Sequence, residues 1–481
     1  MRIYTFLLVV ALTTTATAQK PGDADYPQPS PSARHNQKVA AAKAGNYDLV
    51  LIGDSITQTV GELDGEWAPL KAVWGKHFAP RHALNLGYSG YRTENILWNL
   101  QNGELDFTNS PKVAILLIGT NNTDDQHYKT VHTAEQVFAG TKAIVDLIRQ
   151  RHPTTKILVL RIFPCGGPGA QTSYHRKYNR SAKCVEAYRR AGEMTVQLAD
   201  GQHVFWLDIG HVFLRLDGTI NTDLMPDLIH PNAAGAEAWA QAVEPTLAQL
   251  MGDKPIVDAQ PASTIPVPRS DGCYNWMGRH NAILAAKNTQ PQIVFIGDSI
   301  THHLGGVPAP TGPFDSHRGG TFWETICPTE RPVLNLGFGA DWTQHVLWRI
   351  DHGELDGLAP RHVVLMIGAN NVLNGSDADS ILAGVRACLI RIRAKVPEAK
   401  IILMGVLPCR NPATHPNRAT VAKVNAGLKL LAQEAKCNFL DIGDKFLDAE
   451  GNIPTSLMDD AVHPTPAGYK FWSAALEPVL K

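Results

Sequence analysis

The stretch from Asp48 to Thr57, DLVLIGDSIT, is an apolar run that ends in Gly-Asp-Ser. Such a run predicts a buried strand, and the break after it predicts a turn that exposes the Ser55 hydroxyl at the carboxyl end of that strand. The stretch from Gln292 to Thr301, QIVFIGDSIT, repeats the pattern with Ser299 in the place of Ser55. The chain therefore offers two candidate nucleophiles, one in each half.

Further apolar runs of strand length follow in the same order in both halves. They cover residues 48–52, 83–86, 113–118, 156–160 and 204–209, and then 293–296, 333–336, 363–367, 400–407 and 438–442. Segments with helical spacing lie between them. Strands that are apolar throughout and alternate with helices predict a parallel sheet that is covered on both faces. Each half is expected to be a three-layer α/β/α sandwich that binds ligands beyond the carboxyl ends of its strands.

The size of the chain predicts its number of domains, and its charge excludes one kind of partner. With 481 residues, of which 44% are hydrophobic, the chain is expected to form two domains of about 200 residues each. Its formal net charge of -1 gives no broad attraction to nucleic acid or to anionic membrane surfaces. Nucleic acid is therefore not an expected partner.

The first 18 residues have the pattern of a secretory signal peptide. A basic residue precedes a short apolar run, and the small residues Ala16-Thr17-Ala18 predict cleavage after Ala18. A buried first strand or helix would look similar, but the Pro-rich sequence that follows favours export. No other apolar run is long enough to span a bilayer. We expect a secreted or periplasmic protein without a membrane span.

The composition also predicts the boundaries of the two copies. Residues 19–33 are rich in Pro and Ser and are interpreted as a surface lead-in, and the Pro-rich residues 252–270 as a linker. The first domain is then expected over residues 34–251 and the second over residues 271–481.

Seven cysteines leave at least one thiol unpaired in a monomer. Export permits disulfides. Cys273 with Cys327 is the pair to test first, and Cys165 with Cys184 is a second possibility. Cys409 with Cys437 is unfavourable, because these residues are expected at opposite ends of the sheet.

Each copy has an acid and an imidazole three residues apart near its end, Asp227 with His230 and Asp460 with His463. A Ser hydroxyl becomes a good nucleophile when an imidazole accepts its proton and an acid orients that imidazole. Alone, Asp-x-x-His-Pro would be typical of a capped helix entrance. Its recurrence beside Gly-Asp-Ser in both copies favours a catalytic role.

Two further blocks offer donors for a developing oxyanion. The glycine-rich turns LNLGYSG (residues 84–90) and LNLGFGA (residues 334–340) expose backbone N–H groups after a strand. The blocks IGTNN (118–122) and IGANN (367–371) place an Asn at the same edge. An Asn after Gly is commonly a turn residue, but opposite a candidate nucleophile it is predicted to donate from its side-chain amide.

Taken in order, Gly-Asp-Ser, Gly, Gly-x-Asn and Asp-x-x-His resemble the blocks of the SGNH (GDSL) hydrolases. The sequences that flank these blocks, such as ALNLG (83–87) and HVLWRI with HGEL (345–355), are most similar to the catalytic subunits of the intracellular platelet-activating factor acetylhydrolases. The resemblance covers nearly all of both copies. It implies a flavodoxin-like fold and hydrolysis of short acyl esters through an acyl-enzyme, without a metal or cofactor.

The resemblance also implies residue roles. Ser55 and Ser299 are the nucleophiles, His230 and His463 the bases, and Asp227 and Asp460 their orienting partners. The oxyanion donors are the nucleophile's own N–H together with Gly90 and Asn121 in the first copy and Ala340 and Asn370 in the second.

Two departures from the family pattern stand out. Ala340 replaces a Gly, which keeps the backbone donor provided that its φ is negative. Where the family has an acidic or small residue, the first copy has Tyr91 and the second copy has Asp341. The larger Tyr91 predicts a change in the shape of the first pocket. His127, His302 and His303 lack a spaced carboxylate or thiol partner and are interpreted as polar groups of the pocket rim rather than metal ligands.

The expected protein is an exported tandem esterase with two active sites that removes small acyl groups, such as acetyl, from a carbohydrate, another alcohol or a lipid. The related subunits pair, so the two copies are expected to form an intrachain pseudo-dimer. A lysophospholipase or thioesterase with the same site is the rival among enzymes. A carbohydrate-binding or scaffold protein with an inactive copy is the rival of another class.

Overall fold

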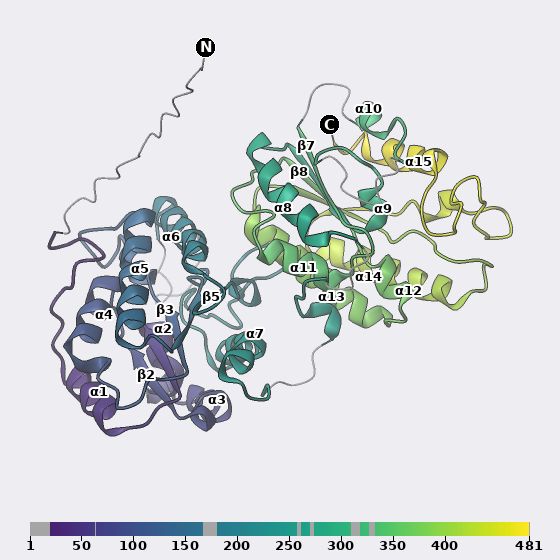
Figure 1. Ribbon diagram of the computed structural model, residues 1–481. Helices are drawn as coiled ribbons and strands as arrows, with labels where there is room; N and C mark the ends of the chain where they lie inside the picture. The colour runs from purple at the N-terminus through teal and green to yellow at the C-terminus, as the bar shows by residue number, and fades with distance from the viewer. Residues whose placement is uncertain are drawn as a thin grey trace, which may run out of the picture. The chain divides into compact units, whose positions relative to one another are not determined.

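The computed structural model describes residues 20–62, 64–166, 180–256, 261–269, 274–308, 318–326 and 332–480. The predicted signal peptide, residues 1–18, lies outside these ranges, as do Cys273 and Cys327. The chain divides into two compact units (Figure 1). The first holds residues up to Leu207 with Ile229–Ala236 and Thr246–Lys254, and the second holds Asp208–Leu228, Glu237–Pro245 and Pro255–Lys481.

The first unit is built on a parallel sheet of five strands in the order β2-β1-β3-β4-β5. The strands are β1 (Leu49–Gly53), β2 (Ala83–Gly87), β3 (Val113–Leu117), β4 (Lys156–Leu160) and β5 (Val204–Leu207). All residues of β1 and β3 are buried, as expected for strands that are covered on both faces. Gly53 at the end of β1 pairs with Gly87 at the end of β2, so the turns after both strands lie at one edge.

The helices of the first copy are α1 (Ala33–Ala44), α2 (Ser55–Glu62), α3 (Leu70–His77), α4 (Thr93–Asn99), α5 (Ala134–Arg151), α6 (Ala182–Met194) and α7 (Ala233–Met251). Helix α4 packs on α5 and α5 on α6, whereas α2 packs on α3. Helix α5 shows why these segments are helical. Thr133 and Gln136 form a capping box at its start, and its buried residues Val137, Ile144 and Ile148 recur at helical spacing.

The second unit repeats this topology, with its five parallel strands in the order β7-β6-β8-β9-β10. The strands are β6 (Ile293–Gly297), β7 (Val333–Gly337), β8 (His362–Met366), β9 (Lys400–Met404) and β10 (Asn438–Leu440). The helices are α8 (Trp276–Ala286), α9 (Ser299–His302), α10 (Phe322–Ile326), α11 (Thr343–Asp351), α12 (Ala369–Leu373), α13 (Ala378–Lys395), α14 (Pro416–Glu434) and α15 (Pro466–Leu476).

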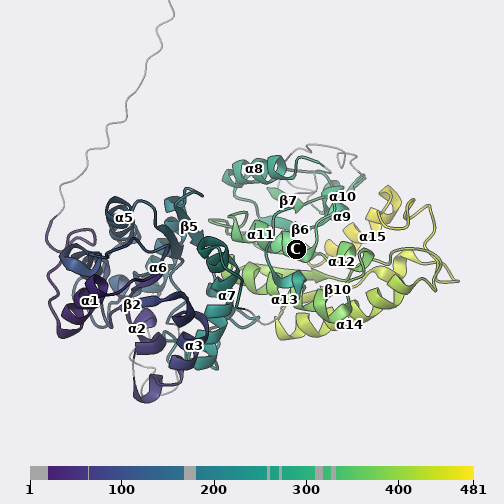
Figure 2. The same ribbon diagram turned by 60° about the horizontal axis from the view of Figure 1, so that its bottom comes forward.

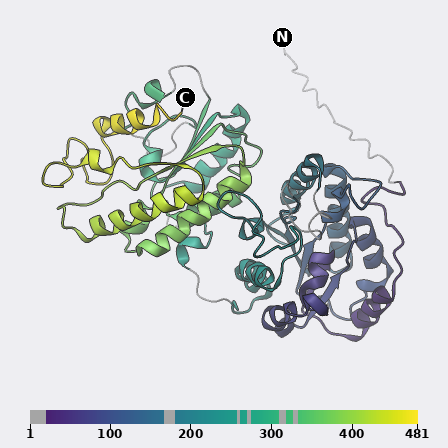
Figure 3. The ribbon, with the colours of Figure 1, turned by 180° about the vertical axis from the view of Figure 1, so that it is seen from behind.

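Helices flank the sheet of each unit (Figure 2). In the second unit, seen from behind in Figure 3, the long helices α13 and α14 pack side by side along one face of the sheet. The predicted fold class, two tandem α/β/α domains with parallel sheets, is therefore confirmed. Within the described residues, no helix is both long and apolar enough to cross a lipid bilayer.

Two short segments that precede the copies pack on them in the same way. We call residues 20–30 and residues 261–269 the two straps. The Thr93 hydroxyl donates to the Ala24 carbonyl in the first copy at 2.8 Å, and the Thr343 hydroxyl donates to the Ser263 carbonyl in the second at 2.9 Å. Ala24 and Ser263 are both buried. The sequence repeat thus extends into segments whose composition indicated only a surface lead-in and a linker.

The second possible disulfide is wrong, because Cys165 and Cys184 are both free and buried. The described cysteines that are free thiols are Cys165, Cys184, Cys388, Cys409 and Cys437. Burial raises the pKa of the Cys165 thiol, which makes it a poor nucleophile. Cys409 and Cys437, which were not expected to pair, are both free.

Candidate active sites

Ser55 is the first residue of α2, and Asp54 alone separates it from Gly53 at the end of β1. The Asp54 side chain accepts a hydrogen bond from the Ile56 N–H at 3.0 Å and so shapes the turn into the helix. In the second copy Asp298 caps α9 in the same way, through the Ile300 N–H at 3.0 Å. Each serine is therefore held at the carboxyl edge of its sheet by the residue before it.

Burial changes the protonation of these two aspartates. Asp54 and Asp298 are both fully buried, and burial raises the pKa of Asp54 to about 6 and that of Asp298 to about 7. Both carboxyls therefore titrate above the usual range of an Asp, while their oxygens accept the N–H groups at the start of the helices.

Each serine lies within hydrogen-bond distance of the predicted base. Ser55 Oγ is 2.8 Å from His230 Nε2, and Ser299 Oγ is 2.8 Å from His463 Nε2. The paired residues are more than 160 positions apart in the chain, so the fold creates both contacts. This geometry allows the imidazole to take the hydroxyl proton as the oxygen attacks.

The acid of the second site is in contact with its histidine. Asp460 Oδ2 lies 2.6 Å from His463 Nδ1, and Asp460 Oδ1 accepts the backbone N–H groups of Val462 and His463. Partial burial alone would raise the pKa of Asp460, but these hydrogen bonds outweigh it and hold the pKa below its usual value. The carboxylate is thus ionised and orients the ring so that Nε2 faces Ser299.

In the first copy, Asp227 is buried and precedes His230 by three residues. The His230 ring makes an edge contact with Trp67, with 5.5 Å between ring centroids. The His463 ring meets His303 instead, at 5.1 Å. The residue packed on the imidazole therefore differs between the two sites.

The condition set for Ala340 is not met, because its φ is +60° rather than negative. Gly90 has a φ of +76°, so both loops adopt the left-handed conformation and direct their N–H groups alike. Glycine accepts this conformation freely, whereas a Cβ opposes it. The sequence repeat conserves the backbone shape of the donor loop although it changes the residue type.

The predicted amide donors reach these loops. The Asn121 amide donates to the Tyr91 carbonyl and the Asn370 amide to the Asp341 carbonyl, both at 2.9 Å. Each amide has a second N–H. The arrangement of serine, imidazole, loop N–H and amide at one edge is what stabilisation of a tetrahedral intermediate requires.

Two asparagines that were not predicted from the sequence, Asn85 and Asn335, position these elements. Asn85 in β2 is fully buried and donates to the carbonyls of Thr57 and Val60 in the helix that begins with Ser55. Asn335 does the same for the Thr301 and Gly305 carbonyls. The feature of the sequence that could have indicated this role is a polar residue within an apolar stretch of strand length, present in both copies.

A glycine in the same block permits this close approach. A Cβ at Gly87 would overlap the backbone of Thr57 and Gln58, and one at Gly337 would overlap the backbone of Thr301 and His302. The helix that begins with the serine therefore rests directly on strand β2 or β7.

A pocket of about 310 Å³ lies over the first site, and its wall includes Ser55, Trp67, Asn121 and His230. His127 also lines it, as expected, but the interpretation that it has no spaced carboxylate partner is wrong, because its Nδ1 lies 2.7 Å from Asp124 Oδ2, three residues before it. His302 is not a rim residue: it is buried, and burial lowers its pKa to about 2. Among the described residues, no cluster of three or more His, Cys, Asp or Glu side chains could hold a metal ion.

The GDSL-like Lipase/Acylhydrolase family matches residues 51–238 and again residues 295–471. The chain belongs to this family. It is 32% identical over 226 residues to platelet-activating factor acetylhydrolase IB subunit alpha1 of Bos taurus. This match covers 46% of this chain and 90% of that protein. It is 35% identical over 216 residues to the alpha2 subunit of Rattus norvegicus, covering 44% and 86%.

Similar solved structures include a GDSL-like lipase from Bacteroides thetaiotaomicron, with 19% identity and a TM-score of 0.34 over 42% of this chain and 96% of that one. An acetylxylan esterase from Geobacillus stearothermophilus has 24% identity and a TM-score of 0.32 over 39% and 93%. The two family matches confirm a tandem chain, and the chain is a carboxylic ester hydrolase.

Proposed function

We propose that this chain is an exported serine esterase that removes short acyl groups, chiefly acetyl, from an alcohol such as a sugar hydroxyl, and that it does so at two active sites. The observation that carries the proposal is the 2.8 Å contact between serine Oγ and histidine Nε2 in both copies. Family membership supports ester hydrolysis as the reaction.

The reaction follows from the geometry of each site. As Ser55 or Ser299 attacks the ester carbonyl, His230 or His463 takes the hydroxyl proton and returns it to the departing alcohol. The carbonyl oxygen gains negative charge and accepts hydrogen bonds from the serine N–H, from Gly90 or Ala340, and from Asn121 or Asn370. Water then repeats the sequence, attacking the acyl-enzyme while the same histidine accepts its proton.

The small acyl group and the compartment have separate support. A pocket of about 310 Å³ at the first site is small, and the relatives are named acetylhydrolases. Export is supported by the signal-peptide pattern of residues 1–18. An exported esterase meets acetylated polysaccharide more readily than an intracellular lipid.

The test replaces the serines by alanine. We expect Ser55→Ala and Ser299→Ala each to lower hydrolysis of p-nitrophenyl acetate, and the double variant to lose activity by about a thousandfold or more. A matched control is Ser110→Ala, because Ser110 Oγ also lies 2.9 Å from a histidine, Nδ1 of His152. Ser110 precedes β3 and therefore lies at the opposite edge of the sheet, so this variant should keep full activity.

Undiminished hydrolysis by the double variant would end the serine mechanism. A comparison of acetyl with octanoyl esters tests the acyl preference separately, and faster turnover of octanoyl esters would favour a lipase or lysophospholipase.

A further inference from the structure

The second unit has a pocket that neither Ser299 nor His463 lines. It has a volume of about 600 Å³ and lies between α14, strand β10 and the segments that follow β9 and β10. Residues of α14 line it at spacings of three and four, so they share one face of the helix: Arg418, Val421, Ala422, Asn425, Ala426 and Lys429. From Arg418 to Lys429 the helix rises by about 16 Å. The pocket is therefore an elongated groove, and we call it the α14 groove.

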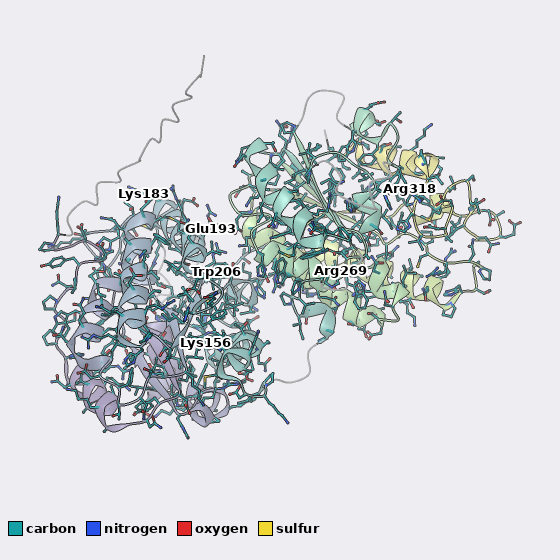
Figure 4. All side chains as sticks on the ribbon, in the orientation of Figure 1. Lys156, Lys183, Glu193, Trp206, Arg269 and Arg318 are labelled. Atoms are coloured by element: carbon teal, nitrogen blue, oxygen red, sulfur yellow. The ribbon has the colours of Figure 1, made fainter. Side chains whose placement is uncertain are left out.

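The two copies differ at the end of the strand beside this groove. In the first copy, Arg161 stands at the position of Gly405, lies against Gly192 of α6 and pairs with Glu193 at 3.3 Å. Figure 4 marks Glu193 on the first unit. In the second copy, a Cβ at Gly405 would lie only 2.9–3.0 Å from atoms of the Asn425 and Asp441 side chains. The glycine therefore lets two polar side chains approach the end of β9, where the first copy has an ion pair.

Asn425 and Asp441 form a fixed polar wall of the α14 groove. Asn425 Oδ1 accepts the Val406 N–H at 2.8 Å, and its amide donates to the Val406 carbonyl at 2.9 Å and to Asp441 Oδ2 at 3.0 Å. Asp441 Oδ1 accepts the Gly443 N–H at 3.0 Å. Asp441 is exposed, whereas its counterpart Asp208 in the first copy is buried. Since each carboxylate oxygen accepts more than one hydrogen bond, Asp441 can accept from a ligand while it keeps these contacts.

The formal charges of the α14 groove cancel. Arg418 and Lys429 are positive, and Asp441 and Asp444 are negative. Nη1 of Arg418 is buried and has no hydrogen-bond partner among the described residues, which is an unfavourable state for a polar group. The guanidinium thus keeps donors for a ligand that enters the groove. Apolar surface is added by Val406, Pro408, Phe439 and Leu447.

These walls match the chemistry of a neutral sugar chain. A sugar hydroxyl donates to a carboxylate and accepts from a guanidinium or an ammonium group, so it satisfies both kinds of charged side chain in the groove. The CH faces of a sugar ring pack against apolar and aromatic side chains such as that of Phe439. An anionic ligand would meet two carboxylates and a cationic ligand two positive groups, and each meeting of like charges is unfavourable.

We propose that the α14 groove binds a segment of a neutral oligosaccharide and so holds a glycan chain on the second unit. The groove lies at the same edge of the sheet as Ser299. In the strand order β6-β8-β9-β10, with about 4.8 Å between neighbours, the ends of β9 and β10 lie about 10 and 14 Å from the end of β6. A polysaccharide whose ester group lies at Ser299 can therefore extend into the groove. This contribution to catalysis rests on the proposed function, whereas the binding of sugar does not.

The experiment measures binding in a chain that lacks both nucleophiles. The Ser55→Ala, Ser299→Ala double variant is titrated in a calorimeter with three neutral probes, xylohexaose, mannohexaose and cellohexaose, and with the anionic hexagalacturonate. These probes carry no ester. We expect at least one neutral hexaose to bind at one site per chain, and to bind more tightly than hexagalacturonate.

Variants of the groove place the bound sugar. Arg418→Met removes the guanidinium but keeps an apolar stem, and it should raise the Kd about tenfold or more. Lys429→Ala and Asp444→Ala remove exposed side chains and should each raise the Kd severalfold without unfolding the unit. Lys423→Ala is the matched control, because Lys423 is exposed on α14 but does not line the groove; its Kd should equal that of the parent.

Three results would overturn the inference. They are the absence of binding by every neutral hexaose, tighter binding of hexagalacturonate than of any neutral probe, and a Kd that Arg418→Met, Lys429→Ala and Asp444→Ala all leave unchanged. The proposed function is judged separately, by hydrolysis of p-nitrophenyl acetate in chains with both serines. That activity would stand if no sugar bound, and its absence would leave the binding of sugar intact.

Discussion

At the scale of single residues, Ala340 carries a strain that Gly90 avoids. Its φ of +60° lies in the left-handed region, where an L side chain costs about 1–2 kcal/mol. Part of this is offset by the greater freedom of glycine in the unfolded chain. We expect Ala340→Gly to raise the free energy of unfolding of the second unit by about 1 kcal/mol, measured by urea denaturation. A loss of stability would show that the alanine is not strained.

The reciprocal change is a matched control. A Cβ at Gly90 would have only the Tyr128 hydroxyl nearby, at 3.4 Å, so space is available and the backbone conformation alone decides. Gly90→Ala should lower the stability of the first unit by a similar amount.

The buried carboxyl of Asp298 makes stability depend on pH. Its pKa is about 7 in the folded protein against 3.8 for an ordinary Asp, so the native state holds the proton more tightly. The resulting stabilisation is full below about pH 4 and is lost as the pH rises to about 7. Asp298→Asn keeps an acceptor for the Ile300 N–H but has no such proton. Wild type should therefore lose stability relative to the variant between these pH values, in thermal unfolding. A constant difference across this range would contradict the assigned burial effect.

At the scale of elements, the two copies support the oxyanion loop with different buried networks. In the second unit Arg349 of α11 is fully buried and bonds to Asp341 at 2.9 Å and Glu354 at 2.6 Å. In the first, the corresponding residue is Asn99, and the Tyr88 hydroxyl donates to Glu104 instead. Aromatic and neutral groups thus replace a buried ion network.

Removing Arg349 alone should lower the free energy of unfolding more than replacing its whole network by the residues of the first copy. Arg349→Asn leaves two buried carboxyls without their guanidinium and should lower the free energy of unfolding by about 3–5 kcal/mol. Adding Phe338→Tyr and Asp341→Tyr, the residues of the first copy, should restore at least half of the loss. Urea denaturation of the single and triple variants measures both effects. A triple variant no more stable than Arg349→Asn would show that the two networks are not interchangeable.

Much of each element was predictable because its signal is local. Apolar runs bounded by Gly and Asp mark the strands, and the order of Gly-Asp-Ser, Gly-x-Asn and Asp-x-x-His placed their ends at one edge of a parallel sheet. The φ of Ala340 was not predictable, because the surrounding loop imposes a conformation that the alanine itself disfavours. The role of Asn85 was missed for a related reason, since its partners in α2 come from tertiary packing.

At the scale of the whole molecule, one topology occurs twice in a single chain, with strand orders that match position by position. The duplication made the sequence informative, because a motif that recurs at the same place in both copies does not arise readily by chance. It did not reveal the difference between the straps. Pro-rich segments lack periodicity, and the correspondence of Ser30 with Arg269 rests on tertiary contacts two residues earlier, where the Gln28 N–H donates to the Glu94 carbonyl and the Val267 N–H to the Gln344 carbonyl.

Catalysis at both sites requires that Ser55 and Ser299 are each activated by their own histidine. The most direct measurement is labelling with a fluorophosphonate, which reacts with activated serines, followed by intact-mass and peptide analysis. We expect two adducts per chain, one on Ser55 and one on Ser299, one adduct in each single alanine variant and none in the double variant. A chain that hydrolyses acetyl esters at full rate while both serines stay unlabelled would contradict this requirement.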